Sequence, residues 1–274
     1  MRLGIFAKTF AGSDPVTVLS AARDAGYGAV QWNMACAGLP AMPDAISPAQ
    51  SAAIRAAADH TGVALAAVSG TYNMAHPDPA HRAAGLRRLS VLIDAAGAMG
   101  TGMVTLCTGT RDPVDQWAHH PDNASPEAWH DMLDEVAKAC ALAEARGVKL
   151  GIEPELANVV DGPAKARLLL DTLQSPALCI VLDPANLFET ASDIARYDII
   201  ARAVDLLADR IAMAHAKDRH PDGSFATAGQ GVVDFPHFIR SLRRAGFDGD
   251  LVTHGLAAGE AAGVAAFLRD CDAD

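Results

Sequence analysis

The chain of 274 residues carries a formal net charge of −11, and half of its residues are hydrophobic. An acidic chain is poorly suited to bind nucleic acid or an anionic membrane, because both partners call for a basic surface. No apolar stretch approaches the length of a membrane-spanning helix. The opening MRLGIF reads as a strand rather than a signal peptide, and the five scattered cysteines form no CxxC pair. We therefore expect a cytoplasmic protein with reduced thiols.

Short apolar runs alternate with longer, alanine-rich amphipathic stretches along the chain. The predicted strands are 3–7, 29–33, 64–69, 103–108, 149–154, 178–183, 211–215 and 251–254. The predicted helices are 15–25, 48–61, 79–99, 126–146, 162–173, 197–208, 236–245 and 260–269. This alternation predicts an α/β fold, a (β/α)8 TIM barrel formed by a single domain over residues 1–274. A doubly wound open sheet is the alternative, but no glycine-rich phosphate loop follows the first strand.

Polar residues end the last four predicted strands, where a barrel carries its chemistry. Glu153 follows the apolar run LGI, and Asp183 follows CIVL. His215 ends IAMAH, and His254 ends LVTH. Taken singly, each has a simpler structural explanation, such as a solvated carboxylate, a turn-capping aspartate or a hydrogen-bonded strand histidine. Together they predict a site for one divalent metal ion, Mn²⁺, Co²⁺, Mg²⁺ or Zn²⁺, because such ions accept mixed oxygen and imidazole ligands.

Several segments carry a resemblance to a known family. They are SGTYNMAHPDP (69–79), CTGTRDP (107–113), HPDN (120–123), GIEPE (151–155), LDPANLF (182–188), HAKD (215–218) and GQGVVDF (229–235). With these segments the chain resembles the sugar phosphate isomerase/epimerases of the xylose isomerase-like TIM-barrel superfamily. The resemblance implies that Glu153, Asp183 and His215 bind the metal, and that Glu153 also acts as an acid/base.

The resemblance also implies a set of residues around the substrate. Glu155 and Lys217 would contact hydroxyl groups, and Asn186 lies three residues past Asp183, where relatives bind substrate. The loops after the third and fourth predicted strands would cover the substrate. Those loops contribute His76, Arg111 and, as an apolar lid, Trp117.

The last predicted strand departs from the family pattern. Well-known epimerases of the superfamily have a glutamate there, which is both a ligand and the second base, whereas this chain has His254. Since an imidazole bound to a metal cannot readily act as a base, His254 is expected to be either a ligand or an acid/base. Lys217 is the other candidate for the second acid/base.

The leading hypothesis is a divalent-metal-dependent isomerase or epimerase of a sugar, keto-sugar or keto-inositol. Glu153 would transfer a proton next to a carbonyl through a metal-stabilised enediolate. A lyase or dehydratase acting by β-elimination and a non-catalytic sugar-binding barrel are the alternatives. An endonuclease IV-like phosphodiesterase is disfavoured, because its three zinc ions need further histidines and Asn186 stands where one is expected.

Four smaller expectations follow from the sequence. The partner is a small-molecule sugar or polyol, and the chain is a candidate homodimer. The helical histidines are expected at the surface; they are His60, His81, His130 and His237. The GQG segment at 229–231 reads as a tight loop whose amides could contact a phosphate.

Overall fold

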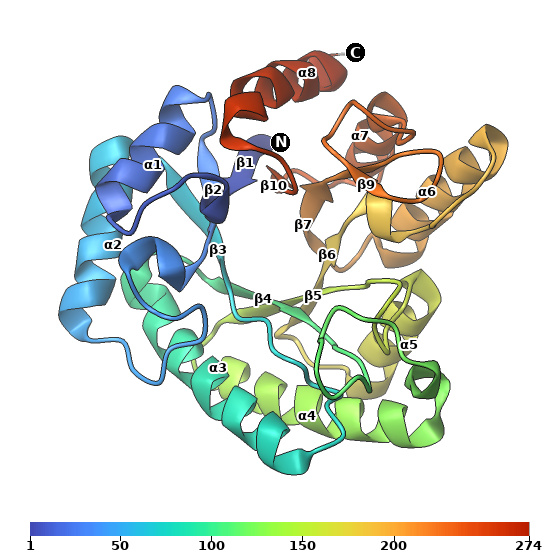
Figure 1. The fold of residues 1–274 in the computed structure, drawn as a ribbon, viewed down its shortest axis with the longest axis horizontal. Helices are drawn as coiled ribbons and strands as arrows, with labels where there is room; N and C mark the ends of the chain where they lie inside the picture. The colour runs from blue at the N-terminus through green and yellow to red at the C-terminus, as the bar shows by residue number, and fades with distance from the viewer. Residues whose placement is uncertain (274) are drawn as a thin grey trace.

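A closed barrel of parallel strands, in the order β1-β10-β7-β6-β5-β4-β3-β2, forms the centre of the molecule (Figure 1). The computed structural model describes residues 1–273. The barrel strands are β1 (Arg2–Phe6), β2 (Ala29–Trp32), β3 (Ala64–Ser69), β4 (Met103–Cys107), β5 (Lys149–Glu153), β6 (Leu178–Leu182), β7 (Ile211–Ala216) and β10 (Asp250–Thr253). Every neighbouring pair in the ring is parallel. The (β/α)8 prediction is confirmed.

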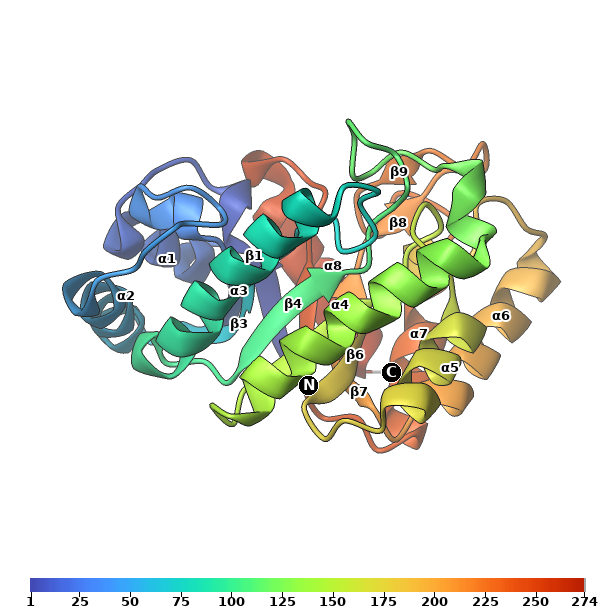
Figure 2. The same ribbon diagram turned by 90° about the horizontal axis from the view of Figure 1, so that it is seen from below.

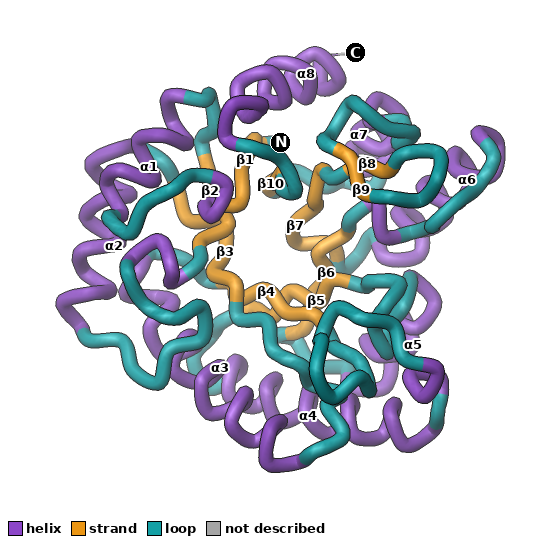
Figure 3. Tube along the Cα trace, in the orientation of Figure 1, coloured by secondary structure: helices purple, strands orange, loops and turns teal. Residues whose placement is uncertain are grey.

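Helices surround the barrel, as the purple outer ring in Figure 3 and the side view in Figure 2 show. They are α1 (Pro15–Asp24), α2 (Pro48–Thr61), α3 (Pro79–Met99), α4 (Pro126–Glu144), α5 (Pro163–Leu173), α6 (Asp193–Leu207), α7 (Phe235–Arg244) and α8 (Ala261–Ala273). None of the helices within residues 1–273 combines the length and apolar character needed to cross a membrane.

Local sequence explains where most helices begin. The side chain of Ser47 accepts a hydrogen bond from the Gln50 backbone amide, and the Gln50 side-chain oxygen accepts one from the Ser47 backbone amide, which makes a capping box at α2. Asp14 and Asp78 cap α1 and α3, and proline stands at the first helical position of both. Helix α6 begins four residues before the predicted 197, because Ser192 caps it by accepting from the Ala195 amide.

The barrel interior is layered along β7. Met213 belongs to a small buried cluster inside the barrel, together with Ala67, Val181 and Val252. His215 follows two residues later on the same face, and Lys217 two residues later again. The layering therefore places an apolar floor below the polar residues of the barrel mouth.

A short two-stranded ribbon follows β7 and was not predicted from sequence. Its strands are β8 (Asp218–Arg219) and β9 (Phe225–Ala226), which pair antiparallel. The buried carboxylate of Asp218 accepts hydrogen bonds from the amides of residues 219, 229, 231 and 233, at 2.8–3.0 Å. The Gly229 and Gly231 amides are thus used within the protein, so the suggested phosphate contact through the GQG amides is wrong.

One helical histidine also differs from its prediction. His237 is only 1% exposed, although its position in α7 indicated a surface residue. Its ring stacks on Tyr197 with the centroids 3.5 Å apart, and Nε2 lies 3.0 Å from the Tyr197 carbonyl oxygen. The first turn of α7 packs against α6, a contact between helices that the sequence pattern of α7 alone does not reveal.

Candidate metal centre

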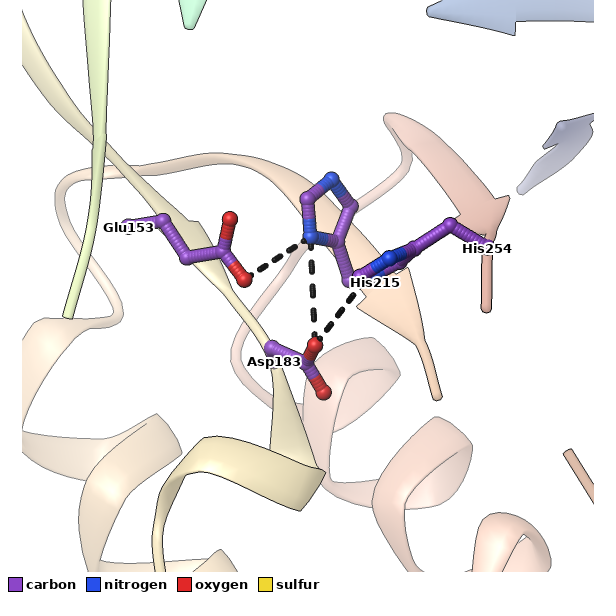
Figure 4. A group of neighbouring side chains, drawn as sticks. All are labelled: Glu153, Asp183, His215 and His254. Atoms are coloured by element: carbon purple, nitrogen blue, oxygen red, sulfur yellow. Dashed lines mark hydrogen bonds and ion pairs between the residues drawn. The ribbon is translucent and has the colours of Figure 1, made fainter. Parts of the chain in front are cut away.

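Four side chains converge at the carboxyl ends of adjacent barrel strands (Figure 4). Glu153 ends β5, His215 lies in β7, and Asp183 and His254 directly follow β6 and β10. The Nδ1 of His215 lies 3.1 Å from Oε1 of Glu153 and 3.9 Å from Oδ2 of Asp183. The Nε2 of His254 lies 3.2 Å from the same Asp183 oxygen. One donor atom from each residue can be chosen so that all four lie within 4.8 Å of one another.

Burial and close charges act in opposite directions on this quartet of Glu153, Asp183, His215 and His254. Burial favours the neutral form of Glu153, but the charge and hydrogen bond of His215, together with the charge of Lys217, outweigh it and lower the pKa of Glu153. The pKa of Asp183 is likewise lowered, because Lys217 and the His254 hydrogen bond outweigh burial. Burial would lower the pKa of His215, yet the charge and hydrogen bond of Glu153 and the charge of Asp183 together raise it. For His254, burial and the His215 charge lower the pKa, which favours the neutral imidazole.

The quartet fits a divalent cation by its donor chemistry. It offers two carboxylates and two imidazoles, a donor set accepted by Mn²⁺, Co²⁺, Zn²⁺ and Mg²⁺ to differing degrees. Both carboxylates are held ionised in an interior where an uncompensated negative charge is costly. Within residues 1–273 this is the one cluster of three or more histidine, cysteine or acidic side chains with such spacing.

Gln31 is a partner of the quartet that the sequence interpretation missed. It lies in β2, on a distant part of the barrel wall, and its Oε1 is 2.8 Å from Nε2 of His215. Its Nε2 donates to Oγ1 of Thr105 in β4 at 3.0 Å. The available signal was a glutamine inside the apolar strand AVQW, because a buried amide needs hydrogen-bond partners.

Asn186 and Lys217 form a second group beside the quartet. The Nδ2 of Asn186 donates to Oε1 of Glu153 at 2.9 Å, and Nζ of Lys217 donates to Oδ1 of Asn186 at 3.1 Å. The same Nζ lies 3.4 Å from Oδ2 of Asp183 and 3.9 Å from the centre of the Phe225 ring. The β8–β9 ribbon supplies Phe225, so this unpredicted element helps to hold Lys217 at the site.

A cavity of about 490 Å³ opens above the quartet. Glu155 lines it, and the Nδ2 of Asn158 donates to Oε2 of Glu155 at 3.1 Å. Trp117 stands at its rim with 52% of the side chain exposed. The cavity size lies in the range of small-molecule sites, about 300–1,000 Å³.

His76 and Arg111 are not brought to this cavity. His76 lines a neighbouring hollow, with Nε2 3.2 Å from the Pro113 carbonyl oxygen and Nδ1 accepting from the Asp78 amide. Arg111 forms an ion pair with Asp131 of α4 at 2.8 Å and donates to a backbone carbonyl. Their contacts connect the covering loops to each other and to α4, so a substrate contact for either stays a prediction.

The chain belongs to the family of xylose isomerase-like TIM barrels, whose model matches residues 19–270. Among solved structures it is similar to a 3-keto-D-glucoside 4-epimerase from E. coli, with a TM-score of 0.80, 17% identity, and coverage of 99% of this chain and 100% of that one. An L-ribulose 3-epimerase gives a TM-score of 0.79 at 17% identity, covering 99% and 94%. No curated protein matches the chain significantly.

A third solved structure is similar to the chain to the same degree. A D-psicose 3-epimerase from Clostridium cellulolyticum H10 has a TM-score of 0.78 at 15% identity and covers 99% of both chains. At these identities the likeness establishes a shared barrel fold. The chemistry of this chain must therefore be argued from its own site residues.

Proposed function

We propose that the protein is a divalent-metal-dependent sugar isomerase or epimerase that transfers a proton next to a carbonyl group. The observation that carries the proposal is the convergence of Glu153, Asp183, His215 and His254 at the floor of a small-molecule cavity. The names of the similar epimerases point to the same reaction class. When bound, the ion would polarise the substrate carbonyl and stabilise negative charge on its oxygen.

Glu153 is the residue that we assign to proton transfer. Its Oε1 accepts a hydrogen bond from Nδ2 of Asn186 and faces Nδ1 of His215. Figure 4 shows the other carboxylate oxygen turned away from Asp183. A carboxylate kept ionised inside the barrel can accept a proton from the carbon next to a bound carbonyl. Asn186 orients this carboxylate by holding one of its two oxygens.

The second acid/base of an epimerase would come from a different side chain than the family's usual glutamate. Lys217 lines the cavity, and its Nζ reaches both Asn186 and Asp183. His254 points its Nε2 at Asp183, which suits a ligand that shares the ion with that carboxylate. We therefore propose His254 as a ligand and Lys217 as the residue that contacts a substrate hydroxyl or returns the proton.

Turnover in D₂O tests the proposal. Protein reconstituted with Mn²⁺, Co²⁺, Mg²⁺ or Zn²⁺ is incubated with ketoses, keto-inositols and 3-keto-glycosides, and products are followed by NMR. Deuterium is expected at the carbon next to the carbonyl, and Glu153→Gln should remove the exchange. Product formation without deuterium would contradict proton transfer and favour a hydride or hydrolytic route.

A second candidate is a β-elimination of water from a keto-sugar or keto-inositol. Glu155 favours it, because burial raises the pKa of this carboxyl group above its ordinary value. A carboxyl group with a raised pKa beside the cavity is better suited than an ordinary one to donate a proton to a departing hydroxyl. The same NMR experiment distinguishes the two reactions, since elimination yields an unsaturated or dehydrated product.

Other aspects of function stay predictions. We propose a sugar or polyol as the small-molecule partner, a single domain over residues 1–274, a homodimer and a cytoplasmic location. Asp274 lies outside the described residues. Metal analysis of the purified protein would identify the ion.

A further inference from the structure

The orientation of His215 is fixed by a hydrogen-bonded chain that crosses the barrel. Thr105 of β4, Gln31 of β2 and His215 of β7 follow one another, and all three are buried. The Gln31 Nε2 donates to Thr105 Oγ1 at 3.0 Å, which turns the Gln31 Oε1 toward His215 Nε2 at 2.8 Å. None of these contacts involves a strand neighbour of β7, because β7 pairs with β6 and β10.

The direction of each hydrogen bond determines which ring nitrogen of His215 carries a proton. A carboxamide oxygen can only accept, so the Nε2 of His215 must be the donor toward Gln31. The opposite nitrogen, Nδ1, then faces the Glu153 oxygen at 3.1 Å and the Asp183 oxygen at 3.9 Å. Ionised carboxylate oxygens are acceptors, so without an ion Nδ1 can pair with Glu153 only if Nδ1 also carries a proton. A bound cation would take the place of that Nδ1 proton, with Nδ1 and the two carboxylates as its ligands, while Nε2 keeps its proton toward Gln31.

We propose that Gln31 is a positioning residue of the metal centre, which keeps the proton on Nε2 of His215 and leaves Nδ1 as the ligand atom. This inference rests on the proposed function, since it requires the quartet to hold an ion. Histidine ligands of metals generally donate their other ring N–H to an outer partner, and loss of that partner weakens metal binding about 10–100-fold. Here the outer partner is a neutral amide, itself oriented by the Thr105 hydroxyl.

The test compares the metal affinity of variants at position 31. Metal-free protein is titrated with Co²⁺, and Kd is read from the visible absorption of the bound ion. Gln31→Met preserves volume but removes the acceptor, and it should raise Kd about 10–100-fold. Gln31→Glu retains an acceptor for the Nε2 proton and should stay near the wild-type value. Asn33→Ala is the matched control, because the Asn33 amide oxygen caps the Ala35 amide at the same strand end.

NMR of the wild-type protein provides a readout that does not depend on any variant folding. In Zn²⁺-loaded, ¹⁵N-histidine-labelled protein, the Nε2 of His215 should carry the proton and Nδ1 should show the shift of a coordinated nitrogen. A proton on Nδ1 would mean that the Gln31 amide is turned the other way, and it would overturn the proposal. An unchanged Co²⁺ Kd in folded Gln31→Met would overturn it as well.

The same measurements separate this proposal from the proposed function. A wild-type protein that binds Co²⁺ while Gln31→Met binds it equally well removes only the role of Gln31. A wild-type protein that binds neither Co²⁺ nor Zn²⁺ removes the metal centre and this role with it.

Discussion

The Nε2 of His254 lies 3.2 Å from Oδ2 of Asp183, although the two residues are 71 positions apart in the chain. Asp183 is fully buried and His254 is 23% exposed, so the carboxylate lies beneath the imidazole at the cavity floor. The same Asp183 oxygen is 3.4 Å from Nζ of Lys217. One buried carboxylate therefore connects the proposed ligand His254 with the proposed acid/base Lys217.

Removal of the His254 ring should weaken metal binding. His254→Ala deletes a proposed ligand, and we expect the Kd for Co²⁺ to rise at least as much as the roughly 10–100-fold seen when an outer partner is lost. His254→Glu supplies a carboxylate in the ring's place and should retain the ion. The exposed His220 provides the control variant His220→Ala. Equal metal content in His254→Ala and the wild type would remove His254 from the ligand set.

Loss of Lys217 should destabilise the metal-free protein in a pH-dependent way. Burial raises the pKa of Asp183, but Lys217 and His254 lower it further than burial raises it. A carboxyl group whose pKa is lowered by folding stabilises the fold above its unfolded pKa of about 3.9, and this stability is lost as the pH falls further. Lys217→Met should therefore cost about 3–5 kcal/mol near pH 7, because it leaves a buried charge without its partner.

Urea unfolding of the wild type and of Lys217→Met, measured between pH 3 and 8, tests this prediction, because these pH values lie on both sides of an ordinary carboxyl pKa of roughly 4. The difference between variant and wild type should shrink toward the acid end of this range, because Asp183 without Lys217 takes up a proton at a higher pH than in the wild type, where its pKa is held well below the ordinary value. Lys165→Met is the control, since Lys165 forms a partly exposed pair with Asp161 and should cost at most ~1 kcal/mol. A difference independent of pH would argue that Lys217 acts through packing alone.

Asp218 should hold the loop that follows the β8–β9 ribbon. Asp218→Asn replaces one acceptor oxygen by a donor group, so the amides of Gly229, Gly231 and Val233 lose part of their bonding. We expect a cost of about 1.5–3 kcal/mol, the range for a hydrogen bond to a charged group. Hydrogen exchange at these amides should accelerate. The exposed Asp222, which caps the ribbon turn, gives the control Asp222→Asn. Unaltered exchange at 229–233 would contradict this role.

Trp117 should contribute to substrate binding more than to stability. Its side chain is 52% exposed at the cavity rim, so Trp117→Ala should change the free energy of unfolding by less than about 0.5 kcal/mol. The loss of an aromatic surface should raise KM about 2- to 10-fold, equivalent to ~0.5–1.5 kcal/mol. Val114→Ala, at a 92% exposed position of the same loop, is the control. Equal KM values for the two variants would remove Trp117 from the binding surface.

The alternation of apolar and amphipathic segments, together with helix-capping residues and prolines, was sufficient to predict the barrel. Prolines after capping serine or aspartate begin most helices, and the predicted strand ranges agree with the structure to within one residue at every end. The quartet was also predictable, because the carboxyl ends of parallel strands meet at one rim and each of its residues ends an apolar run. These signals are local or follow from a repeated topology.

Contacts across the barrel were decided only by the tertiary structure. Gln31 is 184 residues from His215, and no spacing rule connects an interior residue of β2 with one of β7. The β8–β9 ribbon was missed because each of its strands has only two residues, too few to show strand periodicity. Asp218 holds the loop that follows the ribbon by accepting hydrogen bonds from the Gly229 and Gly231 amides. His76 and Arg111 have side chains that could contact a sugar, but their loops place them against other groups. His76 lies next to a backbone carbonyl, and Arg111 pairs with Asp131. The sequence alone thus determined which strand ends are polar, whereas packing determined which polar groups meet, because that depends on distances between segments remote in the chain.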